Sequence, residues 1–215
     1  MNTKMTAGLL RCTCDLSDSS AMTQTIPSHT LDLRSGLLGS VAYLRESYPK
    51  PDWQQHDNFS GLASHWLQIH ESLRGAGAQV RQATADFREG KSSAADFQQI
   101  FIARSRQFFQ HLHGHHQIED QVYFPRFKAL DKRMVAGFEL LEEDHTSIHE
   151  ALVASVNSAQ KLIDSVGLGP DASRSAADAY SADSDLLFKR LLRHLDDEED
   201  LIVPALLHFG DRSVS

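Results

Sequence analysis

Apolar residues recur at helical spacing through four long stretches of this 215-residue chain. A period of three to four residues places apolar side chains on one face of a helix, and no strand-like alternation interrupts the pattern. The pattern predicts helices over about residues 57–88, 92–125, 132–166 and 173–207. Four such helices with short connections predict an all-α fold, an up-down-up-down four-helix bundle.

Glycine and proline residues mark where these helices weaken or end. Residues 167–170 read Gly-Leu-Gly-Pro and separate the third helix from the fourth. Pro125 is expected to kink or end the second helix, because proline removes a backbone donor and clashes with the preceding turn. Gly75 and Gly77 are expected to weaken the first helix locally.

The composition changes along the chain and predicts three parts. We expect residues 1–54 to form a short, partly disordered N-terminal extension, residues 55–208 the bundle and residues 209–215 a tail. Within the extension, an apolar patch at residues 31–53 predicts a short helix followed by a proline-terminated loop that packs on the bundle.

Charge and cysteine usage exclude several classes of protein. A net charge of −8 argues against nucleic-acid binding, and no apolar run reaches the roughly 18 residues of a membrane span. The first residues lack the apolar core of a secretory signal, so a cytoplasmic protein is expected. The two cysteines, Cys12 and Cys14, cannot complete a four-ligand metal site and are expected to be incidental residues of the extension.

A histidine–carboxylate pattern occurs twice, and the second copy follows the first by 79 residues. The matching positions are His70 and His149, His115 and His194, Glu119 and Glu198, and Pro125 and Pro204. An internal repeat indicates two similar halves packed on each other. A histidine and a glutamate four residues apart share one helix face, so the repeated feature is a potential metal-ligand pair.

Five imidazoles and two carboxylates are expected to converge at the centre of the bundle. They are His70, His115, Glu119, His145, His149, His194 and Glu198. His145 is included because it shares a helix face with His149, although Trp66 stands at its matching position in the repeat. The alternative is two solvated helix faces with ordinary charges, which the recurrence disfavours. So many ionisable groups are costly to bury unless they coordinate an ion, and imidazole with carboxylate suits iron, zinc or manganese.

Other polar residues near these positions receive secondary roles. His111 is either a substitute ligand or a histidine that packs beside the ligands, and the second role is favoured. Asp120 and Glu199 are expected at the surface or around the ligands. The residues expected to be solvated or to serve in packing are His65, His113, His116 and His208. Those expected on a solvated acidic face are Glu142, Glu143 and Asp144, with the alternative that one of them orients a ligand imidazole.

The ordered set of histidines and glutamates resembles the hemerythrin-like (HHE cation-binding) proteins over about residues 55–208. The resemblance implies two iron ions in an oxo- or hydroxo-bridged di-iron centre. His145 and His149 match the additional His-x3-His of the oxygen-carrying members. With about six positions on each metal, two bridging carboxylates fill four positions, a bridging oxygen fills two and five histidines fill five, which leaves about one position vacant for a diatomic molecule.

The leading functional hypothesis is a non-haem di-iron protein that binds a diatomic gas for sensing, transport or storage. Dioxygen is the first choice of ligand and nitric oxide the second, and a binding protein is favoured over an enzyme. One alternative is an enzyme of the nitric-oxide or oxidative-stress response, such as an iron–sulfur cluster repair protein or a small peroxidase. The other alternative is iron buffering or metal-dependent regulation of a protein partner, because fold and site do not fix the role.

Overall fold

The computed structural model describes residues 30–59 and 61–214 of the chain. Cys12 and Cys14 lie outside the described residues, as does nearly all of the segment expected to be disordered. Within the described residues the ordered elements are helical and no strand forms.

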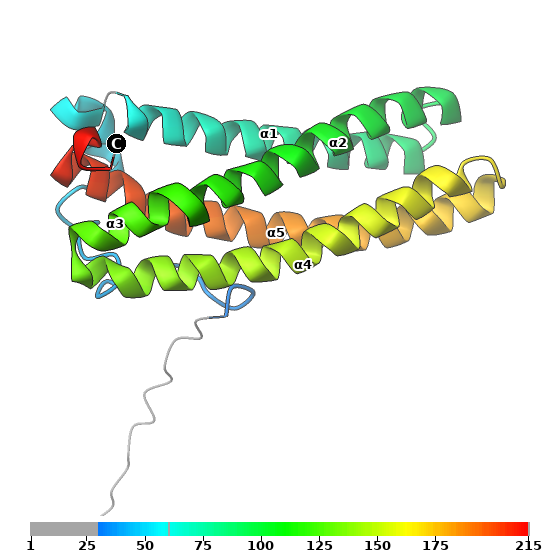
Figure 1. The fold of residues 1–215 in the computed structure, drawn as a ribbon. Coiled ribbons are helices and arrows are strands. Elements are labelled where there is room, and N and C mark those ends of the chain that lie inside the picture. The colour runs from blue at the N-terminus through cyan, green and yellow to red at the C-terminus, as the bar shows by residue number, and fades with distance from the viewer. Residues whose placement is uncertain (1–29, 60, 215) are drawn as a thin grey trace, which may run out of the picture.

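Four long helices, each antiparallel to the one before it, build the bundle (Figure 1). They are α1 (Leu62–Arg88), α2 (Ala94–Ile118), α4 (Val135–Ser165) and α5 (Pro170–Phe209). A short helix, α3 (Phe124–Leu130), extends the path of α2 to the turn before α4. The prediction of an all-α up-down-up-down bundle is confirmed.

The first long helix begins at Leu62 and not near Asp57. Residues Asp57–Phe59 form a separate 3₁₀ turn, η2, and Gly61 follows with a positive φ of 70°. The Leu62 N–H donates to the Asp211 carboxylate over 2.8 Å. A carboxylate from the far end of the chain thus caps the first turn of α1, which no local pattern could predict.

The second helix passes Pro125 without ending. A π-helical turn, η3 (Glu119–Tyr123), joins α2 to α3, and the Phe124 N–H donates to the Glu119 carbonyl. Pro125 follows in the first turn of α3, where its missing N–H leaves no helical bond broken. The expected disturbance is therefore a widened turn before the proline. In α5, Pro204 lies inside a continuous α-helix, so the two halves of the sequence repeat differ in backbone.

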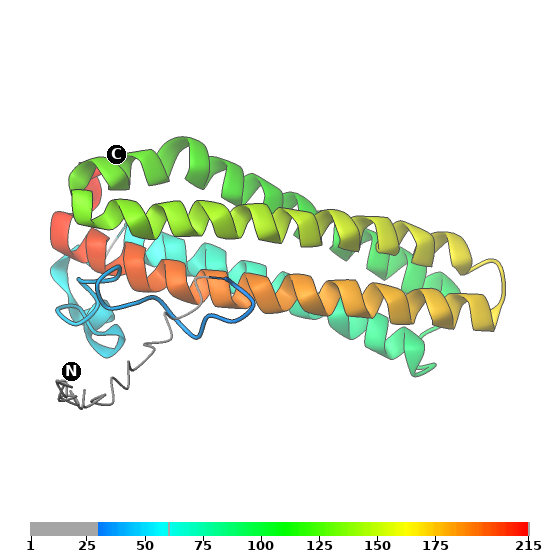
Figure 2. The same cartoon turned by 90° about the horizontal axis from the view of Figure 1, so that it is seen from below.

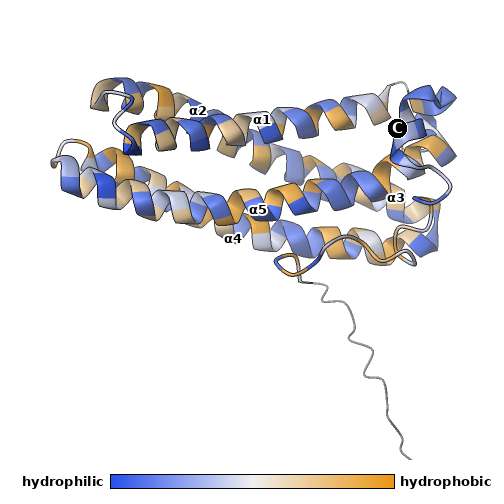
Figure 3. Cartoon of the chain, turned by 180° about the vertical axis from the view of Figure 1, so that it is seen from behind, coloured by the Kyte–Doolittle hydropathy of each residue, from blue (hydrophilic) through white to orange (hydrophobic). Residues whose placement is uncertain are grey.

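Apolar positions form one buried cluster on each side of a central polar layer. Towards the loop ends near residues 90 and 168, the cluster includes Leu73, Phe101, Leu112, Ile148 and Leu191. Towards the end where α3 turns into α4, it includes Trp66, Phe124, Phe138, Leu141 and Ile202. Hydrophilic and hydrophobic positions alternate along the helices (Figure 3), as the periodicity requires.

Gly77 is a packing position in α1. A Cβ at this residue would lie 2.4 Å from Cε2 of Phe188 on α5. Gly75, two residues earlier, has no atom within 4 Å of such a Cβ. Both glycines were expected to weaken the helix. At Gly77 the missing side chain also allows α1 to pack closely against Phe188.

The described part of the N-terminal extension lies against α4 and α5 (Figure 2). Turns and the 3₁₀ helix η1 (Lys50–Gln55) replace the short helix expected within residues 31–53. Leu31 and Leu37 are buried in the two apolar clusters, and Trp53 packs on Val203 and Leu207. The described extension therefore belongs to the packed body of the protein.

Candidate metal centre

The polar layer consists of seven side chains, contributed by all four long helices and by η3. Each is at most 9 % exposed. Their donor atoms form two groups, and the atoms of each group lie within 4.8 Å of one another. The first group is His70, His115, Glu119 and Glu198, and the second is His116, Glu119, His145 and His194.

Two carboxylates connect the groups. Glu119 directs Oε1 to His115 Nε2 at 2.9 Å and Oε2 towards His145 Nε2 at 3.5 Å. Glu198 Oε2 lies 3.5 Å from His70 Nε2 and 3.3 Å from His194 Nε2. Each carboxylate therefore faces a histidine from both groups, which is the arrangement that two bridged metal ions require.

Many of these buried donor atoms have no hydrogen-bond partner among the described residues. They are Nε2 of His70, His115 and His116, both carboxylate oxygens of Glu119, and Oε2 of Glu198. An unpaired buried polar atom costs roughly 1–3 kcal/mol, and more when charged. Bound cations would satisfy all six atoms at once, so the layer fits a metal site better than a polar core.

Three of the histidines place Nδ1 against a carboxylate outside the layer. The pairs are His145 with Asp120 at 2.7 Å, His70 with Glu199 at 3.0 Å, and His194 with Asp144 at 3.4 Å. Such a contact fixes the ring orientation and leaves Nε2 free to face a metal. Asp120 and Glu199 thus lie around the centre, one of the two roles expected for them. Asp144 is 3 % exposed, so the solvated face expected first is wrong for this residue, and its contact with His194 matches the alternative of orienting an imidazole.

Trp66 also contacts the layer, although the repeat aligns it with a histidine. Its Nε1–H donates to Glu198 Oε1 over 2.9 Å. This bond occupies one oxygen of the carboxylate and leaves Oε2 for the centre. Trp66 therefore orients a carboxylate at the position where the second half of the chain carries an imidazole.

Burial sets the protonation of three histidines. It lowers the pKa of His115 to about 3 and the pKa of His116 well below its usual value. Burial also lowers the pKa of His145. These imidazoles are neutral at physiological pH, the form that binds metal ions.

The two carboxylates respond in opposite directions. Burial and the charge of Glu198 raise the pKa of Glu119 well above its ordinary value. Burial opposes ionisation of Glu198, but contacts with His70 and His194 outweigh it and lower its pKa. For His194, burial is likewise outweighed, by Asp144 and Glu198, and its pKa rises to about 9. Without bound cations, Glu119 and His194 therefore tend to hold protons. Bound metal ions would replace these protons as the source of positive charge.

The structure does not bring His149 into the layer. Its side chain is exposed, and its ring lies 6.0 Å from that of His113, outside both groups. Around α4, His145 lies about 60° and His149 about 100° from the fully buried Ile148. The edge of the buried stripe therefore falls between the two histidines. Of the seven residues expected to converge, the structure brings six together in the layer and places His149 outside it.

His116 takes the remaining place, where a solvated or packing histidine was expected. At about 100° per residue, His115 lies about 40° to one side of Glu119 and His116 about 60° to the other. His115 therefore faces α1, and its ring is 5.2 Å from that of His70. His116 faces α4 and stacks on His145 at 3.9 Å. The sequence signal was the adjacent histidine pair astride the buried stripe.

Fold and site together define a helical bundle with a buried histidine–carboxylate layer suited to cations. A family model, the Hemerythrin HHE cation binding domain, matches residues 61–206. This match covers well over half of the chain, and the protein belongs to the hemerythrin HHE family. Searches of curated proteins and of solved structures gave no significant match. None of the helices among the described residues combines the length and hydropathy needed to cross a bilayer.

Proposed function

We propose that the protein holds two iron ions in the polar layer and binds a diatomic gas, dioxygen first, for sensing, transport or storage. The observation that carries the proposal is the Glu119 carboxylate, which belongs to both donor groups and has neither oxygen hydrogen-bonded among the described residues. Nitrogen and oxygen donors without a thiolate suit iron. A bound iron pair would supply redox chemistry and an open coordination position.

The two donor groups would provide different numbers of histidine ligands to the two ions. His70 and His115 would hold one ion, while His116, His145 and His194 would hold the other, with Glu119 and Glu198 shared between them. The ion with two histidines would keep more free positions. An external ligand is therefore expected on the side of His70 and His115.

A cavity borders that side of the layer. It has a volume of about 260 Å³, lies between α1 and α2, and reaches His115 and Glu119. Its apolar lining is Leu62, Ile69 and Ile118, and its polar lining includes His65, His111 and Tyr123. An apolar wall favours entry of an uncharged gas over ions. His111, which belongs to neither group, is suited to contact a ligand in the cavity.

The size of the same cavity favours a second function. About 260 Å³ is several times the roughly 30 Å³ that a water molecule occupies in the liquid. A small organic peroxide fits such a volume as well as a gas does. A small peroxidase is therefore the alternative to a gas-binding protein, and it would use the same layer.

The test begins with anaerobic purification from iron-replete cells, elemental analysis and an absorption spectrum before and after exposure to air. Two irons per chain and a reversible spectral change on exchange of air for argon would support gas binding. Rapid irreversible oxidation by air with turnover of peroxide would support the alternative. One metal ion per chain would contradict the dinuclear proposal.

A pair of glycine variants tests the cavity as the route to the layer. Gly114 lines the cavity, and a Cβ there meets no atom within 4 Å. Gly114→Leu should fill the space and slow the spectral response to the ligand without loss of iron. Gly75→Leu is the matched control, because Gly75 is equally open but lies away from the cavity. Equal rates in the two variants would exclude this route.

A further inference from the structure

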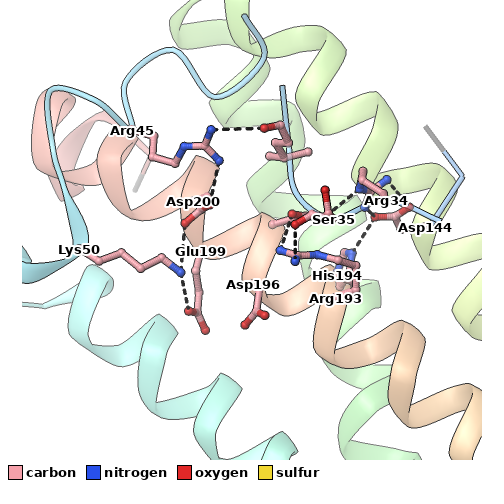
Figure 4. A network of polar contacts seen from close by, with 12 residues as sticks. Arg34, Ser35, Arg45, Lys50, Asp144, Arg193, His194, Asp196, Glu199 and Asp200 are labelled. Atoms are coloured by element: carbon pink, nitrogen blue, oxygen red, sulfur yellow. Dashed lines mark hydrogen bonds and ion pairs between the residues drawn. The ribbon is translucent and has the colours of Figure 1, made fainter. Parts of the chain in front are cut away.

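The N-terminal segment of residues 30–59 inserts one arginine between α4 and α5. The Arg34 side chain is 4 % exposed, although it lies outside the residues matched by the family model. Its Nε donates to Asp197 over 2.7 Å. Its Nη1 and Nη2 donate to the two oxygens of Asp144, Nη1 over 3.2 Å (Figure 4). The planar guanidinium is thus hydrogen-bonded to the carboxylates of both Asp144 and Asp197.

Asp144 links Arg34 to the candidate metal centre, because the same carboxylate also contacts His194. Its Oδ2, which accepts from Arg34, is also the atom 3.4 Å from His194 Nδ1. On the other side of the imidazole, Nε2 faces Glu198 at 3.3 Å. A continuous path of contacts therefore runs from Arg34 through Asp144 and His194 to Glu198 in the polar layer.

The same segment supplies a second cation near the other donor group. Lys50 Nζ lies 3.9 Å from Glu199 Oε2, and Glu199 Oε1 is 3.0 Å from His70 Nδ1. Arg74 of α1 also donates to Glu199, over 2.7 Å. Lys50 is half exposed and shares this carboxylate, so its influence is the weaker one.

Further contacts hold the segment in place without reaching a histidine of the layer. Asp32 pairs with Arg190 at 2.7 Å, and Arg45 pairs with Asp200 at 3.1 Å. Arg45 therefore provides a comparison for Arg34. Both arginines belong to the segment and pair with an aspartate of α5, but only Arg34 contacts a carboxylate that orients a candidate ligand.

We propose that Arg34 is a positioning residue for the metal centre, so that the N-terminal segment sets how tightly the centre holds metal. The planar, two-point grip of arginine restricts Asp144 to one orientation. Asp144 then keeps His194 Nδ1 engaged and its Nε2 directed at the layer. The inference rests on the proposed function only in requiring that His194 binds a metal ion in the layer. Loss of a carboxylate that orients a metal-binding histidine typically lowers metal affinity by about 10–100-fold, and removal of Arg34 would release that carboxylate.

The experiment measures cobalt(II) binding to the full-length chain by competition with a chelator, together with the visible absorption of bound cobalt. Arg34→Ala and Asp144→Asn are each expected to weaken cobalt binding by about 10–100-fold and to change the spectrum. Because both act through His194, the double variant should bind little worse than either single variant. Arg45→Ala should retain wild-type affinity and spectrum.

The outcomes separate a positioning role from a purely structural one. A lower melting temperature of Arg34→Ala with unchanged affinity and spectrum would overturn the inference, as would additive effects in the double variant. If Arg34→Ala does not fold, Arg34→Lys serves, since it keeps the charge but loses the two-point grip. Wild-type affinity in Arg34→Lys would also overturn the inference.

The wild-type control distinguishes this inference from the proposed function. Uptake of one cobalt ion per chain would refute the metal pair, while a weaker Arg34→Ala would still support positioning through His194. Uptake of two ions with an unchanged Arg34→Ala would refute the positioning role alone. A wild-type chain that binds no cobalt would refute both.

Discussion

Replacing His116 and His149 separately decides between the sequence repeat and the tertiary structure. The repeat makes His149 the partner of His70, whereas the structure places His116 in the layer and His149 at the surface. His116→Ala removes a buried donor that stacks on His145 at 3.9 Å. His149→Ala removes an exposed ring and should change stability by no more than about 0.5 kcal/mol.

The expected size of the His116 effect follows from metal linkage. Loss of a residue that only orients a ligand costs up to about 100-fold in affinity, so loss of a direct donor should cost at least that. Each tenfold is about 1.4 kcal/mol, which makes the loss about 2.8 kcal/mol when metal is in excess. For a protein of this size, that lowers the melting temperature by roughly 6–11 °C.

The assay is calorimetric melting with excess metal and again with chelator, alongside metal content. The chelated samples measure the packing lost with the His116 ring, and the remaining difference reports the metal. His116→Ala should lose metal and most of the metal-dependent stability, while His149→Ala should match wild type. If His149→Ala lost metal and His116→Ala retained two ions, the placement of His116 in the layer and of His149 at the surface would be refuted.

Three further results are expected. Chelation should lower the melting temperature of the wild-type protein by several degrees, since the apo layer holds unpaired buried atoms; identical melting with and without metal would argue against a metal site. Metal loading near neutral pH should release protons, because the metal-free pKa of His194 is about 9 and that of Glu119 is raised. Calorimetry in buffers of different ionisation enthalpy measures this release, which should decline as the pH rises past about 9, and heats independent of buffer would contradict it. In urea denaturation, Gly77→Ala should destabilise by about 1–3 kcal/mol through overlap with Phe188, while Gly75→Ala should stabilise by about 1 kcal/mol. Equal effects at the two glycines would show that the close approach at Gly77 does not limit packing.

The sequence by itself determined the bundle and the pairs of candidate ligands within single helices. Helical periodicity is a local property, so the four helices follow from the spacing of apolar residues. The pairs His115 with Glu119 and His194 with Glu198 are equally local, because residues four apart share a face whatever the helix packs against.

Tertiary packing decided which residues beside those pairs enter the layer. His145 and His149 share a face, but the rotation of α4 against its neighbours places the edge of the buried stripe between them. In the same way, the rotation of α2 about its own axis turns His116 towards the layer. These angles depend on apolar clusters assembled from all the helices, and the repeat could not supply them, because only the first copy carries a π-turn after its glutamate.

The contribution of the N-terminal segment came from the tertiary structure alone. Arg34 reaches Asp144 across 110 residues of sequence. In the sequence, Asp144 is one of three consecutive acidic residues, which is the usual pattern of a solvated helix face. It is buried because a distant arginine covers it and balances its charge, and a carboxylate can be buried at low cost only when such a partner is present.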